Sequence, residues 1–179
     1  PLRIFLIIVA LSFSGFFISR GDVVGSILGF LGALLVAYGY LAYGTVHKAS
    51  QLLKHGDIAK AYSLLKQTRF PSFLKDPHRA SYHFTLGYIF LDEQFLDTDR
   101  SLDHFRKAFN IGAMTENNRG ICLINIASIE LEHGNIDSAR SYFDQSAKYT
   151  LKKELKPIIK EIKTKLEAEE SNNDPGSKN

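Results

Sequence analysis

Two apolar runs separated by a short polar turn constrain this chain more than any other feature. The runs cover residues 4–18 and 23–43, and the only charged side chains between them are Arg20 and Asp22. A helix needs roughly 20 apolar residues to cross a bilayer core of about 30 Å. The second run reaches that length, and the first approaches it. The sequence therefore predicts a transmembrane helical hairpin over residues 1–44.

The first run also admits a different interpretation. A single basic residue, Arg3, precedes an apolar core whose length suits a cleaved signal peptide. However, a second full-length run follows almost at once, which favours a retained hairpin over a cleaved leader.

The charges that flank the second run predict its orientation. Seven basic and two acidic side chains lie between Lys48 and Arg79, whereas the turn between the runs holds one arginine. Lysine and arginine close to a span mark the cytoplasmic side. We therefore expect both termini and the repeat domain in the cytoplasm. Because no organelle-targeting presequence is apparent, the expected location is a bacterial inner membrane.

Small residues recur every fourth position along the second run. The recurrence predicts a stripe of small side chains for close packing of membrane helices. It leaves open whether the stripe packs on the first run or on another protein. The stripe consists of Gly21, Gly25, Gly29, Ala33 and Ala37.

From residue 45 onward the apolar period is helical, and three stretches share one arrangement. In the third stretch, twelve positions separate Ala127 from Ala139, and Gly134 marks a turn between two helices. In the first stretch, Ala49 and Ala61 have the same spacing. The middle stretch is less regular, since its turn is about two residues longer and lacks glycine.

These stretches resemble the tetratricopeptide repeat, a helix pair of about 34 residues with small residues where the helices cross. Equivalent small residues Ala61, Ser101 and Ala139 recur at intervals of 40 and 38 residues. The resemblance covers residues 45–150. It implies an all-α, three-repeat helical solenoid.

The remaining residues suit a cap for such an array. Apolar positions from Leu155 to Leu166 form one stripe among lysines, and Pro157 lies where a helix tolerates proline. Repeat arrays need a terminal cap with a polar outer face. We therefore predict a capping helix over residues 151–170 and a disordered polar tail over 171–179.

The sequence contains no motif typical of a catalytic or metal-binding site. No phosphate loop, nucleophile elbow or H-E-x-x-H motif occurs, and no two histidines have i, i+4 spacing. The single cysteine, Cys122, is expected to be a buried apolar residue. A net charge of +3 is too small to indicate nucleic acid. We expect no enzyme activity, no cofactor, no metal site and no nucleic-acid partner.

The resemblance to tetratricopeptide repeats implies a protein-binding surface along the first helix of each pair. The residues that this frame places there are mostly apolar or aromatic, so we expect an apolar helix or extended segment as the ligand. The predicted groove residues are Tyr43, Val46, Ser50, Lys54, Phe84, Tyr88, Leu91, Ile121, Ile124, Ser128 and Leu131.

The sequence thus favours a membrane-anchored interaction adaptor, an accessory or assembly subunit of a larger membrane complex. Its partners are expected to be an integral membrane protein or membrane-associated complex and the lipid bilayer. The alternative is a structural membrane protein that self-assembles into homo-oligomers through the stripe of small residues.

Overall fold

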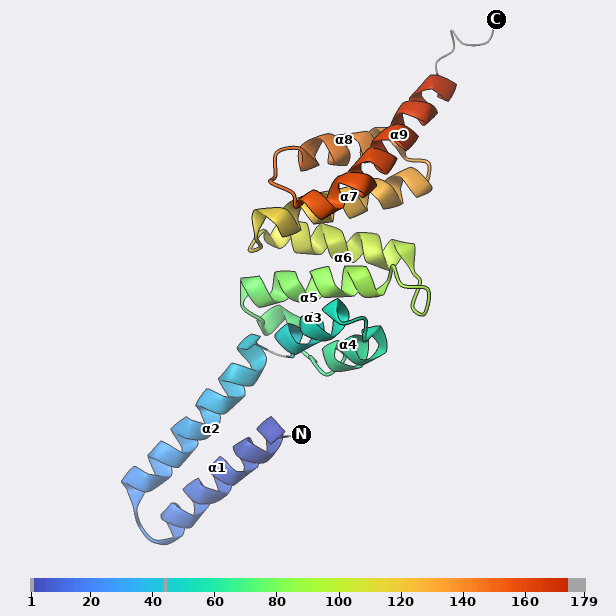
Figure 1. Ribbon diagram of the computed structural model, residues 1–179. Coiled ribbons are helices and arrows are strands. Elements are labelled where there is room, and N and C mark those ends of the chain that lie inside the picture. Colours follow the sequence, from blue (N-terminus) through green and yellow to red (C-terminus); the bar gives the residue numbers. More distant parts are fainter. Residues whose placement is uncertain (1, 44, 174–179) are drawn as a thin grey trace, which may run out of the picture.

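A computed structural model describes residues 2–43 and 45–173, apart from the side chains of residues 2–4, 6, 7, 40–43 and 170–173. Within these residues every regular element is a helix and no strand is present. The predicted all-α class is therefore confirmed. Figure 1 shows a helical hairpin that leads into a stack of helices.

The hairpin consists of α1 (Leu2–Ser19) and α2 (Val23–Tyr43). The stack then runs through the following elements in chain order: α3 (Val46–Lys54), α4 (Ile58–Leu65), the 3-10 turn η1 (Pro71–Phe73), α5 (Asp76–Ile89), α6 (Thr98–Ile111), α7 (Glu116–Glu132), α8 (Ile136–Ser146), the 3-10 turn η2 (Lys153–Leu155) and α9 (Lys156–Asn173).

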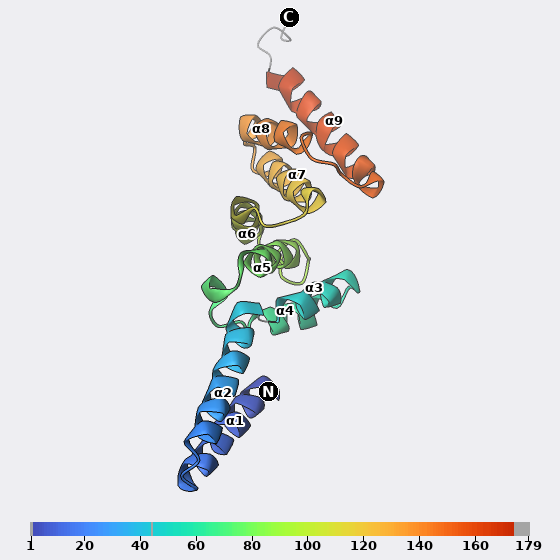
Figure 2. The same cartoon turned by 90° about the vertical axis from the view of Figure 1, so that its left-hand side faces the viewer.

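The stack has a helical-repeat-like arrangement. Helices α3 and α4, α5 and α6, and α7 and α8 form successive pairs, and each pair contacts the next one along the chain. Figures 1 and 2 show the same ascending order in two perpendicular views. Contacts between sequence neighbours are the defining property of repeat arrays.

Glycine turns close the first and third pairs in the same way. Gly56 and Gly134 adopt φ of +79° and +75°, a left-handed conformation that glycine reaches without strain. After Gly56, the Asp57 N–H donates to the Leu52 carbonyl at 2.9 Å, and after Gly134 the Asn135 N–H donates to the Glu130 carbonyl at 2.9 Å. This bonding satisfies carbonyls that the helix end leaves unpaired.

Small residues allow the paired helices to approach closely. Ala61, Ser101 and Ala139 each have no exposed surface. The Ser101 hydroxyl donates to the Gly87 carbonyl at 2.8 Å, which ties α6 directly to the backbone of α5. A larger side chain at any of these positions would push the two helices of a pair apart.

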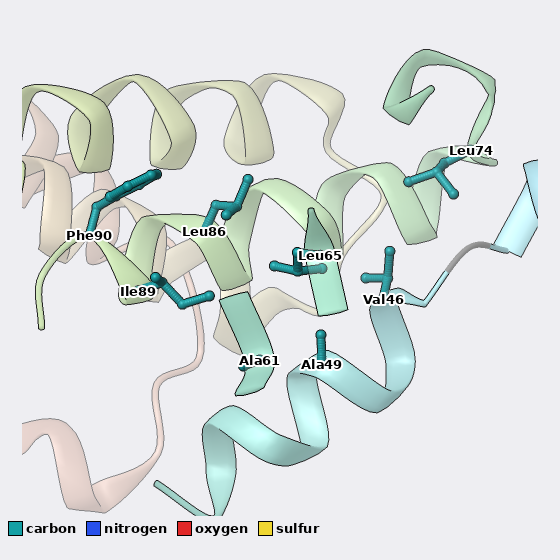
Figure 3. Packing of buried hydrophobic residues seen from close by; sticks show 8 residues of the cluster. All are labelled: Val46, Ala49, Ala61, Leu65, Leu74, Leu86, Ile89 and Phe90. Carbon is teal, nitrogen blue, oxygen red and sulfur yellow. The ribbon is translucent and has the colours of Figure 1, made fainter. Parts of the chain in front are cut away.

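The first core cluster joins α3, α4 and α5. Its buried residues are Val46, Ala49, Ala61, Leu65, Leu74, Leu86, Ile89 and Phe90. Figure 3 shows these side chains converging between the three helices, with Leu74 and Val46 on the side nearest α2. The core therefore begins immediately after the hairpin.

The C-terminal cap differs in detail from the expectation. Ile162 and Leu166 are buried against α7 and α8, but Ile158 is exposed. Helix α9 includes Ser171–Asn173, which belonged to the predicted tail, and the rest of that tail lies outside the described residues. The predicted apolar stripe therefore wrongly included Ile158, because only one face of α9 packs on the stack.

The hairpin helices pack on each other along their length. In the part of the chain that the structure describes, none of the helices combines the length and the apolar character required to span a membrane.

Candidate partner-binding groove

A groove of about 790 Å³ follows the first helices of the three pairs, α3, α5 and α7. The segment 152–155, which precedes α9, forms its remaining wall. The lining residues are Ser50, Leu53, Lys54, Ile58, Ser81, Phe84, Thr85, Tyr88, Leu91, Asp92, Asn117, Asn118, Ile121, Lys152, Glu154 and Leu155.

Aromatic rings from α5 line the groove and pack against a ring of α6. The rings of Phe84 and Tyr88 meet edge to face with centroids 5.1 Å apart, and Tyr88 meets Phe105 of α6 in the same way at 5.4 Å. Such pairs add stability beyond the area that they bury. Burial also raises the pKa of Tyr88, so its phenol stays neutral at physiological pH.

A small polar cluster lies where α3 meets α5. The hydroxyls of Ser50 and Thr85 are 2.8 Å apart, and those of Ser50 and Ser81 are 3.3 Å apart. Thr85 also donates to the Ser81 carbonyl at 2.7 Å. Thr85 is only 1% exposed, so the partly exposed hydroxyls of Ser50 and Ser81 are the ones at the groove surface.

A glycine lies where the segment before residues 152–155 crosses α7. A Cβ added to Gly120 would come within 2.6 Å of a Leu151 methyl group and 3.0 Å of the Tyr149 Cβ, so a side chain there would make this segment shift. The Lys152 N–H then donates to the Asn117 side-chain oxygen at 3.0 Å. The cap is therefore held against the entrance of the groove.

Charged residues of both signs border the groove. Lys54 and Lys152 lie among its lining residues together with Asp92 and Glu154. Their formal charges cancel, so the groove lacks the one-sign field that attracts nucleic acid or a strongly acidic ligand.

The structure brings together part of the predicted groove set. Phe84, Tyr88, Leu91 and Ile121 all line the groove, as do the accompanying Ser50 and Lys54. These residues come from α3, from α5 and the turn after it, and from α7. The expected repeat pattern was the basis for grouping them.

Other members of the predicted set lie elsewhere. Val46 has no exposed surface and Ile124 has 3%, so both belong to the core and their placement in the groove was wrong. Leu131 is half-buried against the third core cluster. A shift of one helical position is enough to turn a side chain from the concave face into the core. The side chain of Tyr43 lies outside the described residues.

The stripe of small residues faces α1 of the same chain. A Cβ on Gly29 would come within 3.1 Å of the Ser14 backbone, and one on Gly25 within 2.8 Å of the Phe17 ring. Ala33 is buried and Ala37 half-buried, whereas Gly21 lies exposed in the turn with φ of +72°. The α1 helix therefore covers the centre of the stripe.

Two histidines that are distant in the sequence meet beside the groove helices. The Nδ1 atoms of His83 and His104 are 2.9 Å apart, and the His104 ring stacks on Phe90. Burial, followed by the neighbouring His104, lowers the pKa of His83 to about 4. Burial also lowers the pKa of His104. The pair is therefore neutral at pH 7 and shares one N–H···N hydrogen bond.

Cys122 is buried as expected, and burial raises the pKa of its thiol to about 12, which leaves no thiolate for nucleophilic chemistry at neutral pH. Among the described side chains, no group of three or more His, Cys, Asp or Glu residues is arranged to hold a metal ion.

No family model, no curated protein and no solved structure matches the chain. The functional interpretation therefore depends on the geometry of the groove and on the surface of the hairpin.

Proposed function

We propose that this chain is a membrane-anchored adaptor without catalytic activity, built on tetratricopeptide-like repeats. It acts as an accessory or assembly subunit of a larger membrane complex. The observation that carries this proposal is the groove along α3, α5 and α7, which combines aromatic rings with hydrogen-bonding hydroxyls. A groove of this kind suits a protein segment better than a charged small molecule.

The surface of the hairpin supports attachment to a membrane. Large apolar side chains cover its outer faces, and their exposed fractions range from 41% for Val9 to 71% for Leu35. A soluble monomer rarely exposes so large a continuous apolar surface. Removing one such side chain from water contributes about 1.5–3 kcal/mol. A lipid bilayer is the environment that offers this gain to both helices at once.

The ligand that we propose is an apolar helix or extended segment of a partner protein. The rings of Phe84 and Tyr88 offer area for apolar contact, and the cancelling charges around the groove give no preference for an acidic ligand. Because α3 follows α2 after two residues, the groove lies close to the end of α2 at which the chain would leave the membrane. A partner that is itself embedded in the membrane meets that geometry.

The proposed orientation follows from the flanking charge. Basic residues dominate between Lys48 and Arg79, and such residues stay on the cytoplasmic side. We therefore propose a cytoplasmic repeat domain at a bacterial inner membrane. Both termini lie on that same side.

Self-assembly through the stripe of small residues is less well supported. Gly25 and Gly29 already contact α1, so the stripe does not present a free face to another copy. A homo-oligomer would need a different surface of the hairpin.

Purification of the tagged full-length chain from its native membrane in mild detergent tests the proposal. We expect one membrane protein to co-purify in a fixed ratio. The Asn118→Trp variant fills the groove and should abolish co-purification, whereas Asp144→Trp, on the exposed surface of α8, should not. Recovery of the chain alone, as a defined oligomer, would support self-assembly instead.

A further inference from the structure

The segment between α4 and α5 exposes two aromatic rings next to the hairpin. Phe70 is 56% exposed and Phe73 is 66% exposed, and their ring centroids are 6.1 Å apart. The neighbouring Leu74 is only 3% exposed and belongs to the first core cluster. Leu74 therefore anchors the segment, while the two rings point away from the core.

This segment lies beside the C-terminal end of α2, where the chain would leave the membrane. The 3-10 turn η1 contacts α2 as well as α5. The Lys75 ammonium lies 6.0 Å from the centre of the Tyr38 ring, on the last part of α2. In Figures 1 and 2, the short turn before α5 lies beside the end of α2 where the stack begins. Figure 3 places Leu74 on that same side of the core.

The charge of the segment is uniformly positive. Residues 66–75 contain three basic side chains and no acidic one, namely Lys66, Arg69 and Lys75. The nearest acidic residue in sequence, Asp76, pairs with Arg79 at 2.7 Å. Exposed aromatic rings surrounded by basic side chains suit the interface of an anionic bilayer, where rings enter the headgroup layer and cations meet lipid phosphates.

We propose that residues 66–75 form a second membrane contact, in which Phe70 and Phe73 enter the headgroup region of an anionic bilayer and Lys66 and Arg69 bind lipid phosphates. This proposal rests on the proposed membrane attachment of the hairpin. The contact fixes the tilt of the repeat stack, because it adds an attachment to the bilayer beyond the chain link after α2 and the small contact between η1 and α2. The groove is thereby held at a defined angle to the membrane surface.

Tryptophan fluorescence tests this contact directly, because the chain contains no tryptophan. The full-length chain is reconstituted into vesicles whose lipids carry bromine high on the acyl chains, with or without phosphatidylglycerol. Phe73→Trp reports on the segment and Phe30→Trp on the hairpin. Leu96→Trp is the matched control, since Leu96 is 62% exposed and follows the opposite end of α5 from η1.

We expect the emission of Phe73→Trp to be blue-shifted and quenched by brominated lipid in vesicles that contain phosphatidylglycerol. Quenching should weaken in neutral vesicles and after Lys66→Gln with Arg69→Gln. Leu96→Trp should remain unquenched. These substitutions are at exposed positions, so the fold is retained.

Two results would overturn the proposal while leaving the anchored hairpin intact. In the first, Phe30→Trp is quenched but Phe73→Trp is not. In the second, Phe73→Trp is blue-shifted without quenching, which would indicate cover by protein. Quenching that ignores lipid charge would contradict the role of Lys66 and Arg69. If neither Phe30→Trp nor Phe73→Trp is quenched, the membrane attachment itself fails.

Discussion

The ring of Phe105 occupies the space in which a side chain on Gly87 would lie. A Cβ built on Gly87 would come within 2.9 Å of three atoms of that ring. Gly87 thus lets α6 approach α5 closely enough for Ser101 to bond the α5 backbone, and it presses Phe105 against the groove ring Tyr88. The packing behind the groove depends on this one absent side chain.

Gly87→Ala should therefore destabilise the repeat stack by about 1–3 kcal/mol, the usual cost of overpacking a core. Thermal unfolding of the detergent-solubilised chain, followed by circular dichroism, measures the effect. Gly87→Ala should cost less stability when it is made in a Phe105→Leu background than in the wild-type chain, because the two positions share one space. An equal cost of Gly87→Ala in both backgrounds would show that the contact does not limit the packing.

The His83–His104 pair predicts a pH dependence of stability. The folded pKa of His83, about 4, is below the value of about 6.5 for an unfolded histidine. Between these values the unfolded chain binds more protons, so the free energy of unfolding rises with pH. The stability that the neutral pair provides is complete above about pH 6.5. It is lost as the pH falls toward about 4.

His83→Gln should flatten the change in stability between those two pH values. Charged neighbours Arg79, Lys107 and Asp103 remain in the variant, so their contributions cancel in the comparison. His55→Gln changes an exposed histidine and should keep the wild-type slope. Urea unfolding at a series of pH values gives both slopes, and identical slopes for all three proteins would refute the linkage.

Cys122 should be inert in the folded chain. Its thiol is buried with a pKa of about 12, so maleimide should label it only after unfolding in denaturant. Labelling of the native chain at the rate of an exposed thiol would show that α7 opens readily.

Because the sequence contains a single cysteine, a Cys122→Ala background lets introduced cysteines map the hairpin. Ser19→Cys reports on the turn between α1 and α2, and Ser72→Cys on the exposed segment before α5. In intact cells, an impermeant maleimide should label only the turn if the hairpin crosses the membrane with the repeats inside. Labelling of Ser72→Cys alone would reverse the proposed orientation. Protection of both sites until the cells are opened would indicate a hairpin that enters the bilayer without crossing it.

The contact between Gly29 and Ser14 predicts how the stripe responds to substitution. Gly29→Leu should separate α1 from α2 and lower the thermal stability of the hairpin, because its side chain would meet the Ser14 backbone. Gly32→Leu is the matched control, since nothing lies within 4 Å of its added Cβ. Size-exclusion chromatography in detergent should show an unchanged oligomeric state for both variants. Loss of a defined oligomer only with Gly29→Leu would favour self-assembly through the stripe.

Sequence reasoning identified the features that follow from local rules. The helix pairs follow from the spacing of Ala49 and Ala61 and from turn glycines such as Gly134, because small crossing residues and left-handed turns are local requirements. The same repeat pattern correctly placed Phe84 and Ile121 among the residues that line the groove. Val46 and Ile124 were misplaced, because the frame does not fix the angular position of a side chain to within one residue.

The spacing of residues in the sequence could not predict contacts between side chains of different helices. His83 of α5 and His104 of α6 meet although 21 residues separate them in the sequence. Glu130, 2% exposed, pairs with Arg106 of α6 and accepts a hydrogen bond from Asn135. No spacing rule predicts such a buried pair.

The sequence also did not predict that the segment before α9 packs against the groove. Leu151 packs on Gly120 from a segment about thirty residues away, and only the folded arrangement shows this close contact. Two features of the sequence could have indicated these contacts: a charged residue at an expected core position and an isolated glycine within a helix.

A photoreactive amino acid placed in the groove tests the central claim most directly. It would replace Leu91 in the full-length chain, in native membranes, with Asp144 on α8 as the control position. We predict that irradiation links position 91 to one membrane protein, that position 144 gives no such product, and that adding Asn118→Trp removes it. A product formed equally from both positions, or one made only of two copies of this chain, would contradict the adaptor function.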